Sequence, residues 1–99
     1  MDEIQLKLEA NGQGSFVLEN DGERLAEMVI SVGRQSIMVY HTEVSEKLKG
    51  QGIATKLLST MVDYARKHHL KVIALCPFVS AQFKKHPKLY ADVWNQHWR

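Results

Sequence analysis

The chain has 99 residues, of which 44% are hydrophobic and 24% are charged; this predicts one folded domain over residues 1–99 and excludes a disordered chain. No apolar run approaches the roughly 18–20 residues that span a bilayer, and the acidic start Met1–Ile4 is unlike a signal peptide, so we expect no membrane association. A single cysteine, Cys76, excludes internal disulfides and multi-cysteine zinc sites, and we expect a cytoplasmic protein.

Charge is divided unequally along the chain. Residues 1–46 carry a net charge of −6, whereas residues 47–99 carry a net charge of +8. Two interpretations stay open: the basic half binds an anionic partner, or the two halves neutralise each other in the fold.

The first half predicts an antiparallel meander of about four strands, because apolar and β-branched residues alternate with polar ones between turn signals. The turns are short, as in hairpins. The expected strands are residues 4–8, 15–19, 24–32 and 36–42.

The hydrophobic period changes after Gly52. From Ile53 to Ala65 apolar residues recur every three or four positions, which predicts an amphipathic helix ending near His69. The apolar run Lys71–Cys76 predicts a buried strand, and strand, helix, strand in this order implies a parallel pair with a right-handed crossover.

Short helices are expected at the C-terminal end. Residues 80–86 predict one helix, which Pro87 ends. Trp94 and Trp98, four residues apart, are expected to pack a terminal helix. The fold class is therefore α+β, with helices packed around a mixed sheet.

A glycine pair, Gly50 and Gly52, lies where the fourth strand leads into the long helix. Glycine lets the backbone approach a ligand, and the free N–H groups of a helix start favour phosphate. Lys47, Lys49 and Lys56 surround the pair. The alternative is that the two glycines only make a turn; the pattern is neither a Walker loop nor a Rossmann fingerprint.

Three titratable side chains are candidates for chemistry. Cys76 follows a predicted parallel strand, where its thiol can act as a nucleophile toward a thioester; the alternative is a buried hydrophobe. His41 and Glu43 share one face of the fourth strand and suit a general base, and a protonated His41 near Cys76 would favour the thiolate. The alternative is that they solvate a strand end. No histidine spacing suggests a metal site.

The segment Lys49-x-x-Gly52-x-Ala54 resembles the pyrophosphate loop of the GNAT superfamily of acyl-CoA-dependent N-acetyltransferases. Together with His41–Val44, Leu75–Phe78 and Phe83–Pro87, it resembles a small subgroup of about one hundred residues with Cys-Pro after strand five. The resemblance implies a three-layer GNAT-like fold whose fifth strand splays at the ligand cleft, with acetyl-CoA as co-substrate. The residues that it implies at the CoA site are Thr42, Val44, Lys49, Gly50, Gln51, Gly52, Ile53, Ala54, Thr55, Lys56, Pro77 and Phe83.

Two departures from the family pattern stand out. Lys49 replaces the usual Gln or Arg, which keeps the charge but not the planar fork. Phe83 falls where many members have a tyrosine that protonates the leaving CoA thiolate. The early helices and late strands that usually form the acceptor site are also missing.

These observations favour an acetyl-CoA-dependent N-acyltransferase acting on a primary amine of unknown identity, either a small molecule or a protein. The alternatives are a non-catalytic acyl-CoA-binding module and, third, a nucleic-acid-binding protein, which the lack of a basic stripe with interleaved aromatics disfavours. We expect a monomer that needs no metal.

Overall fold

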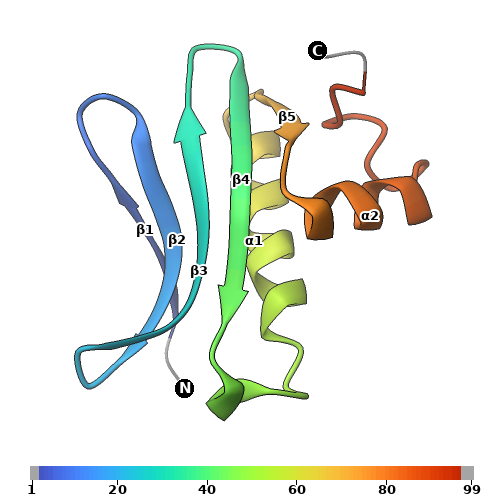
Figure 1. Ribbon diagram of the computed structural model, residues 1–99. Coiled ribbons are helices and arrows are strands. Elements are labelled where there is room, and N and C mark those ends of the chain that lie inside the picture. The colour runs from blue at the N-terminus through green and yellow to red at the C-terminus, as the bar shows by residue number, and fades with distance from the viewer. Residues whose placement is uncertain (1–2, 97–99) are drawn as a thin grey trace.

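The computed structural model describes residues 3–96. Its centre is a five-stranded mixed sheet in the order β1-β2-β3-β4-β5, against which the helices pack (Figure 1). The first four strands form the predicted antiparallel meander, and β5 joins its edge in parallel with β4. The strands are β1 (Ile4–Leu8), β2 (Gln13–Asn20), β3 (Glu23–Val32), β4 (Ser36–Val44) and β5 (Lys71–Ala74).

A bulge in β4 changes which side chains face the core. Ile30 of β3 pairs with Val39 and Val29 pairs with His41, so no residue of β3 lies opposite Tyr40 in the strand register. One extra residue reverses the two-residue alternation of a strand. The core-facing positions are therefore odd-numbered before the bulge and even-numbered after it, where Thr42 reaches the core residue Cys76.

Helix α1 (Ile53–Lys67) confirms the predicted amphipathic helix. The helix packs against the sheet through an apolar stripe. Removing this apolar surface from water stabilises the folded state. The buried residues of the stripe are Ile53, Leu57, Leu58, Met61, Val62 and Ala65. These residues join the inner faces of β2, β3, β4 and β5 in one hydrophobic core.

The region after β5 differs from the prediction. The strand ends at Ala74 instead of Cys76, and helix α2 (Pro77–Lys85) begins three residues earlier than expected. The physical reason is Pro77, whose fixed φ suits the first turn of a helix, with Cys76 as the N-cap residue.

The predicted terminal helix at Trp94 is wrong. Trp94 forms a parallel bridge with Val72, and the backbone N–H of Val72 donates to the Val93 carbonyl at 2.6 Å. The segment thus covers the outer edge of β5, which would otherwise expose unpaired backbone groups. Trp98 and His97 lie outside the described residues.

The sheet is covered on one face by α1, and α2 packs beside β4 and β5. The predicted α+β class, with helices packed around a GNAT-like mixed sheet, is confirmed. No helix in the described part of the chain is long and apolar enough to cross a membrane.

Candidate functional site

The loop between β4 and α1 is shaped by two glycines. After Val44, Ser45 caps the short 3-10 helix η1 (Glu46–Leu48) by accepting a hydrogen bond from the Lys47 N–H at 3.2 Å. Gly50 and Gly52 then adopt φ angles of +81° and +69°, which other residues rarely take. A Cβ atom at either position would meet nothing within 4 Å, so open space lies beside both glycines.

A cavity of about 310 Å³ lies in this open space, at the start of α1. Gly52 is the N-cap and offers no side-chain hydrogen bond, so the first N–H groups of α1 have no acceptor within the helix. Such groups and the helix dipole favour an anion. The lining residues are Val44, Ser45, Glu46, Leu48, Lys49, Gly50, Gly52, Ile53, Ala54 and Thr55.

The predicted lysines differ in their surroundings. Lys49 lines the cavity and is exposed. Lys47 forms an ion pair with Glu23 at 2.9 Å, so its charge is already matched. Lys56 and Gln51 line a second, neighbouring cavity, on the β1 and β2 side of the helix.

Strands β4 and β5 part beyond Val39. The Val39 carbonyl accepts hydrogen bonds from the N–H groups of Leu75 and Cys76, at 3.0 and 2.8 Å, and strand pairing stops there. Among residues 3–96 no strand pairs with β4 on the β5 side beyond this point, up to Val44, so this backbone edge can accept an extended ligand as an added strand. The splay that the family resemblance implies is therefore present.

Cys76 lies at the apex of this splay. Its Sγ atom is 3.3 Å from Thr42 Oγ1, a contact that joins the separating ends of β4 and β5. The Cys76 residue is only 2% exposed and belongs to the hydrophobic core. The thiol is thus placed at the predicted cleft but is shielded from solvent.

His41 and Glu43 share one face of β4, as predicted, and form a contact of 3.2 Å between Nε2 and Oε1. Their side chains are 56% and 63% exposed. Because of the bulge at Tyr40, this is the face opposite Thr42, not the face that carries Cys76. The structure does not pair His41 with Cys76, and the carboxylate beside the imidazole is Glu43.

Phe83, which was expected at the CoA site, is a buried residue of the hydrophobic core. Phe83 is 0% exposed, stacks on Tyr90 with ring centroids 4.6 Å apart, and contacts Trp94 edge-on at 5.7 Å. Phe83 lies four residues after the buried Val79 on α2, so both side chains are on the same face of the helix and point into the core. Pro77, by contrast, is exposed at the start of α2.

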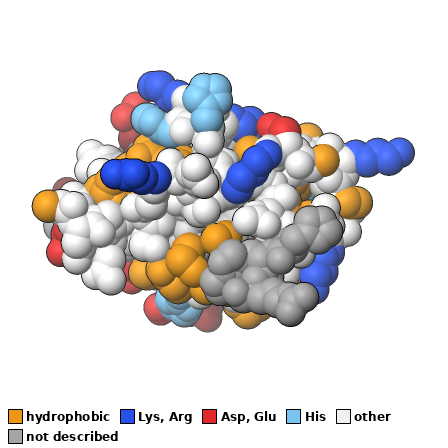
Figure 2. All heavy atoms as spheres, turned by 90° about the horizontal axis from the view of Figure 1, so that it is seen from above, with side chains coloured by type: hydrophobic (Ala, Val, Ile, Leu, Met, Phe, Trp, Pro, Cys, Tyr) orange, Lys and Arg blue, Asp and Glu red, His pale blue; other side chains and the backbone are white. Residues whose placement is uncertain are grey.

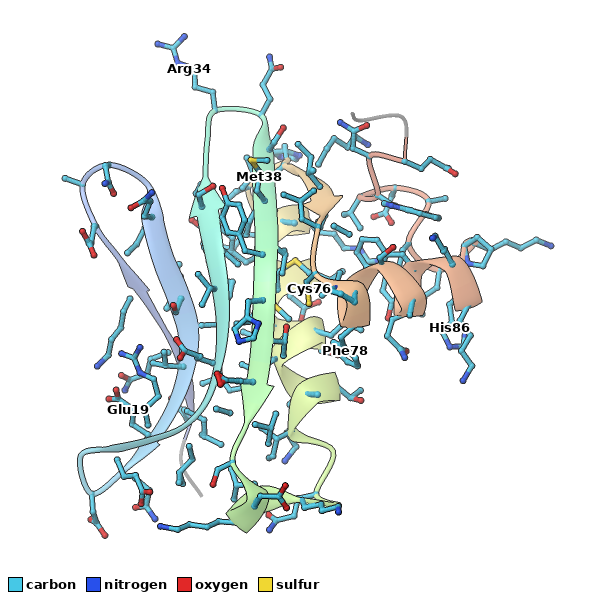
Figure 3. The ribbon with its side chains drawn as sticks, viewed as in Figure 1. Glu19, Arg34, Met38, Cys76, Phe78 and His86 are labelled. Atoms are coloured by element: carbon cyan, nitrogen blue, oxygen red, sulfur yellow. The ribbon has the colours of Figure 1, made fainter. Side chains whose placement is uncertain are left out.

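Other residues near the site were missed. Figure 3 shows Cys76 and Phe78 close together where β5 gives way to α2, and Phe78 is only partly buried. Ser45 and Leu48 line the loop cavity. The aromatic residue directly after Cys-Pro was a usable signal for Phe78, whereas Leu48 depends on η1, which the sequence did not predict.

Among residues 3–96 no group of three His, Cys, Asp or Glu side chains is placed to hold a metal ion. The site has four parts. The first is an anion cradle, formed by Gly50, Gly52 and the first backbone N–H groups of α1. The others are the open edge of β4, the shielded thiol of Cys76, and the exposed imidazole–carboxylate pair. These are means of holding a phosphorylated, extended ligand and of accepting a proton.

Comparison with known proteins agrees with this geometry. Residues 15–93 match a family described as GCN5-related N-acetyl-transferase. An NMR solution structure of a GCN5-like protein from Staphylococcus aureus is 31% identical, covers 100% of both chains and has a TM-score of 0.65.

Two further proteins share part of this similarity. Protein NATD1 from Xenopus tropicalis is 30% identical over 56 residues, which are 57% of this chain and 51% of that protein, so the chain spans about half the length of this relative. The crystal structure of ribosomal-protein-alanine N-acetyltransferase from Brucella melitensis biovar Abortus 2308 has a TM-score of 0.60 over 89% of this chain and 68% of that chain. At 20% identity that likeness concerns the fold.

Proposed function

The chain belongs to the family of GCN5-related N-acetyltransferases, and we propose that it transfers an acetyl group from acetyl-CoA to a primary amine. Family members use an acyl-CoA co-substrate in general. The observation that carries the proposal is the open cradle at Gly50 and Gly52, adjoining the unpaired edge of β4. The residues present suit the phosphates and the extended arm of CoA.

In this proposal Lys49 and the first N–H groups of α1 hold the pyrophosphate, and the edge of β4 around Thr42 and Val44 aligns the pantetheine arm. The thioester then lies in the splay beside Cys76. The amine approaches from the face that carries His41 and Glu43, which take a proton from the ammonium.

Two routes lead from this arrangement to product. In the direct route the amine nitrogen attacks the thioester carbonyl, the C–S bond breaks and CoA leaves as a thiolate that water protonates. In the second route the Cys76 thiolate takes the acetyl group first, releasing CoA, and the amine then displaces the thiolate. The burial of Cys76 favours the direct route, because the second requires the thiol to become accessible.

A specific observation favours a second candidate function, an acyl-CoA-binding module without turnover. Phe83, at the position that the resemblance matches to the proton donor of many family members, has no proton to donate and lies in the core, which supports this second candidate. General acid catalysis contributes typically about 10²–10⁴-fold, so a transferase without it would be slow.

Calorimetry with CoA tests the site. Gly52→Asp places a carboxylate in the cradle and should weaken CoA binding at least about tenfold, which is ~1.4 kcal/mol. Gly22→Asp is the matched control, because Gly22 has a φ of +81° and equally open surroundings but lies in the β2–β3 turn. Equal affinity in both folded variants would remove the cradle from the proposal.

Release of CoA thiol from acetyl-CoA, with and without a panel of amines, tests turnover. We expect amine-dependent release that rises with pH and falls in His41→Ala or Glu43→Gln, with CoA affinity retained. Cys76→Ala separates the routes: loss of transfer together with loss of an acetylated protein in mass spectra indicates the covalent one. CoA binding without release for any amine favours the binding module.

A further inference from the structure

Two exposed apolar side chains lie next to each other where β4 and β5 part. Val39 and Ala74 are the last residues of these strands that pair, so Tyr40 and Leu75 follow them side by side in the parallel register. Tyr40 is 42% exposed and Leu75 is 43% exposed. In the described part of the chain the exposed large apolar residues are Leu8, Tyr40, Leu75 and Leu89, so two of these four meet at one place.

Both side chains lie on the face of the sheet that α1 leaves open. Leu75 follows Ala74, which packs against the core, and its N–H still donates to the Val39 carbonyl, so the alternation of the strand directs its side chain to the opposite face. Tyr40 shares this face, because its hydroxyl lies 2.8 Å from the hydroxyl of Ser31, a residue of β3 whose two neighbours face the core.

The pair flanks the apex of the splay, where the proposed function puts the thioester. On the core side of the apex Thr42 and Cys76 are in contact at 3.3 Å. On the open side Tyr40 and Leu75 follow directly after the last paired residues. An amine that reaches the thioester from the open side must therefore pass over these two apolar side chains.

Negative charge lies beside the apolar pair on the same face. His41 follows Tyr40 and contacts Glu43 at 3.2 Å. Glu27 stands opposite Glu43 in the register of β3 and β4, and Arg24 pairs with Glu27 at 3.3 Å. The Glu43 side chain is 63% exposed, so an incoming ammonium is attracted to its carboxylate.

Beyond Leu75 the charge of the surroundings is positive. A cavity of about 290 Å³ lies beside β5 and α2, and its lining includes Ile73, Leu75, Trp94 and the exposed Lys84. The apolar part of an acceptor can extend over Leu75 into this cavity. A second ammonium at its far end would meet the like charge of Lys84.

We propose that Tyr40 and Leu75 select the acceptor, which is a small primary amine with one positive charge and an apolar chain. Its ammonium lies at Glu43 and gives a proton to the His41–Glu43 pair, and its chain lies on Tyr40 and Leu75. The neutral nitrogen then attacks the thioester carbonyl, the C–S bond breaks, and CoA leaves as a thiolate that water protonates. This inference rests on the proposed acetyl transfer and adds the chemical class of the acceptor.

Hexylamine and cadaverine are the probes, because they have equally many heavy atoms and differ in whether the far end is a methyl group or an ammonium. For CoA release from acetyl-CoA, kcat/KM should be at least about tenfold higher with hexylamine. Leu75→Ser and Tyr40→Ser should each reduce this preference to about threefold or less, with CoA affinity retained. Leu8→Ser is the matched control and should keep the preference, because Leu8 is also 43% exposed but lies in β1.

Binding provides a measurement that does not depend on turnover. In the complex with CoA, hexylamine should shift the backbone amide signals of Tyr40, His41 and Leu75 more than cadaverine does. Hexylamine that binds in this way while no amine releases CoA contradicts the acetyl transfer and leaves the amine site in place.

Three results overturn this inference alone while acetyl transfer stands. The first is CoA release that is no faster with hexylamine than with cadaverine. The second is a lysine-containing peptide that is acetylated faster than hexylamine. The third is a preference for hexylamine that persists in both Leu75→Ser and Tyr40→Ser. If no amine binds and none releases CoA, both proposals fall.

Discussion

Single residues set the conformation of the cradle. Gly52 is both the N-cap of α1 and a residue with φ +69°, and no neighbouring atom prevents a side chain there. The choice of residue at this position is therefore limited by the positive φ angle and by the room that a bound ligand needs, not by contacts with neighbouring side chains. Gly52→Ala tests the effect of the backbone angle on stability, whereas Gly52→Asp tests the effect of an added charge on ligand binding.

Gly52→Ala should lower stability by about 1 kcal/mol, because a Cβ atom disfavours positive φ. For a domain of this size that corresponds to a melting temperature about 4–8 °C lower. Gly33→Ala is the control: no left-handed φ is found there, and the added Cβ would lie an ordinary 3.6 Å from Ser36 O. Equal melting temperatures in thermal scans of the two variants would contradict the strain argument.

Phe83 gives a second prediction for a single residue. Phe83→Tyr restores the family's phenol but places its hydroxyl in a fully buried position, with a cost of roughly 1–3 kcal/mol if it finds no partner. We expect a lower melting temperature and no gain in acetyl transfer. Phe78→Tyr, in the same helix but only partly buried, should change stability little. A faster Phe83→Tyr enzyme would return this position to the active site.

Elements hold one another at the C-terminal side of the sheet. Arg66 of α1 donates from Nε to Asp92 Oδ2 at 2.8 Å and from Nη2 to the Leu89 carbonyl at 2.8 Å. Lys71 of β5 donates to the Asp92 carbonyl. These contacts fix the segment whose Val93 and Trp94 cover β5, so α1 and β5 together anchor the end of the described chain.

The Arg66–Asp92 pair predicts an acid-sensitive contribution to stability. The hydrogen bond from Arg66 lowers the pKa of Asp92, so its carboxylate stabilises the fold above the ordinary Asp pKa of about 3.9, and this contribution is lost as pH falls through the lower folded value. The melting temperature of Asp92→Asn should therefore lie below that of the parent protein at about pH 6 and equal it at about pH 2. The pair is exposed and worth about 0–1 kcal/mol, so the shift is a few degrees. Thermal scans at both pH values check this, and a difference that persists in acid would contradict it.

The whole molecule keeps its charges partly separated. Lys47 pairs with Glu23 across the two halves of the sequence, but Lys7 and Arg24 pair within the acidic half and Arg66 within the basic half. In the view of Figure 2 the lysine and arginine side chains stand apart, without a continuous basic stripe on that face. In the proposed function, the exposed Lys49 at the cradle attracts the CoA phosphates by its positive charge.

Salt should therefore weaken CoA binding. Raising NaCl from about 0.05 to about 0.5 M shortens the screening length, and we expect the affinity for CoA to fall about threefold or more. Pantetheine, which lacks the phosphates, is the control and should bind with little change. Calorimetry at the two salt concentrations decides; parallel responses of both ligands would show that phosphate attraction is not the cause.

The sequence by itself determined the four-stranded meander, the long helix with its glycine-rich start, and the parallel return strand, because hydrophobic period and turn residues act locally. It also placed His41 and Glu43 on one face of β4, since strand side chains alternate. Which face that is was decided by the bulge at Tyr40, a property of pairing with β3 that no local pattern contains.

Tertiary packing likewise decided the fate of Phe83 and Cys76. Phenylalanine and cysteine occur both in active sites and in hydrophobic cores, so the residue type alone does not predict their burial. Here both are buried because α1, α2 and the segment around Trp94 pack together around them. The second cavity, beside Ile4 and Leu18, was also beyond the sequence, because it exists only where α1 leaves part of the sheet uncovered. Local periodicity specifies elements, whereas burial and cavities depend on how separate elements meet.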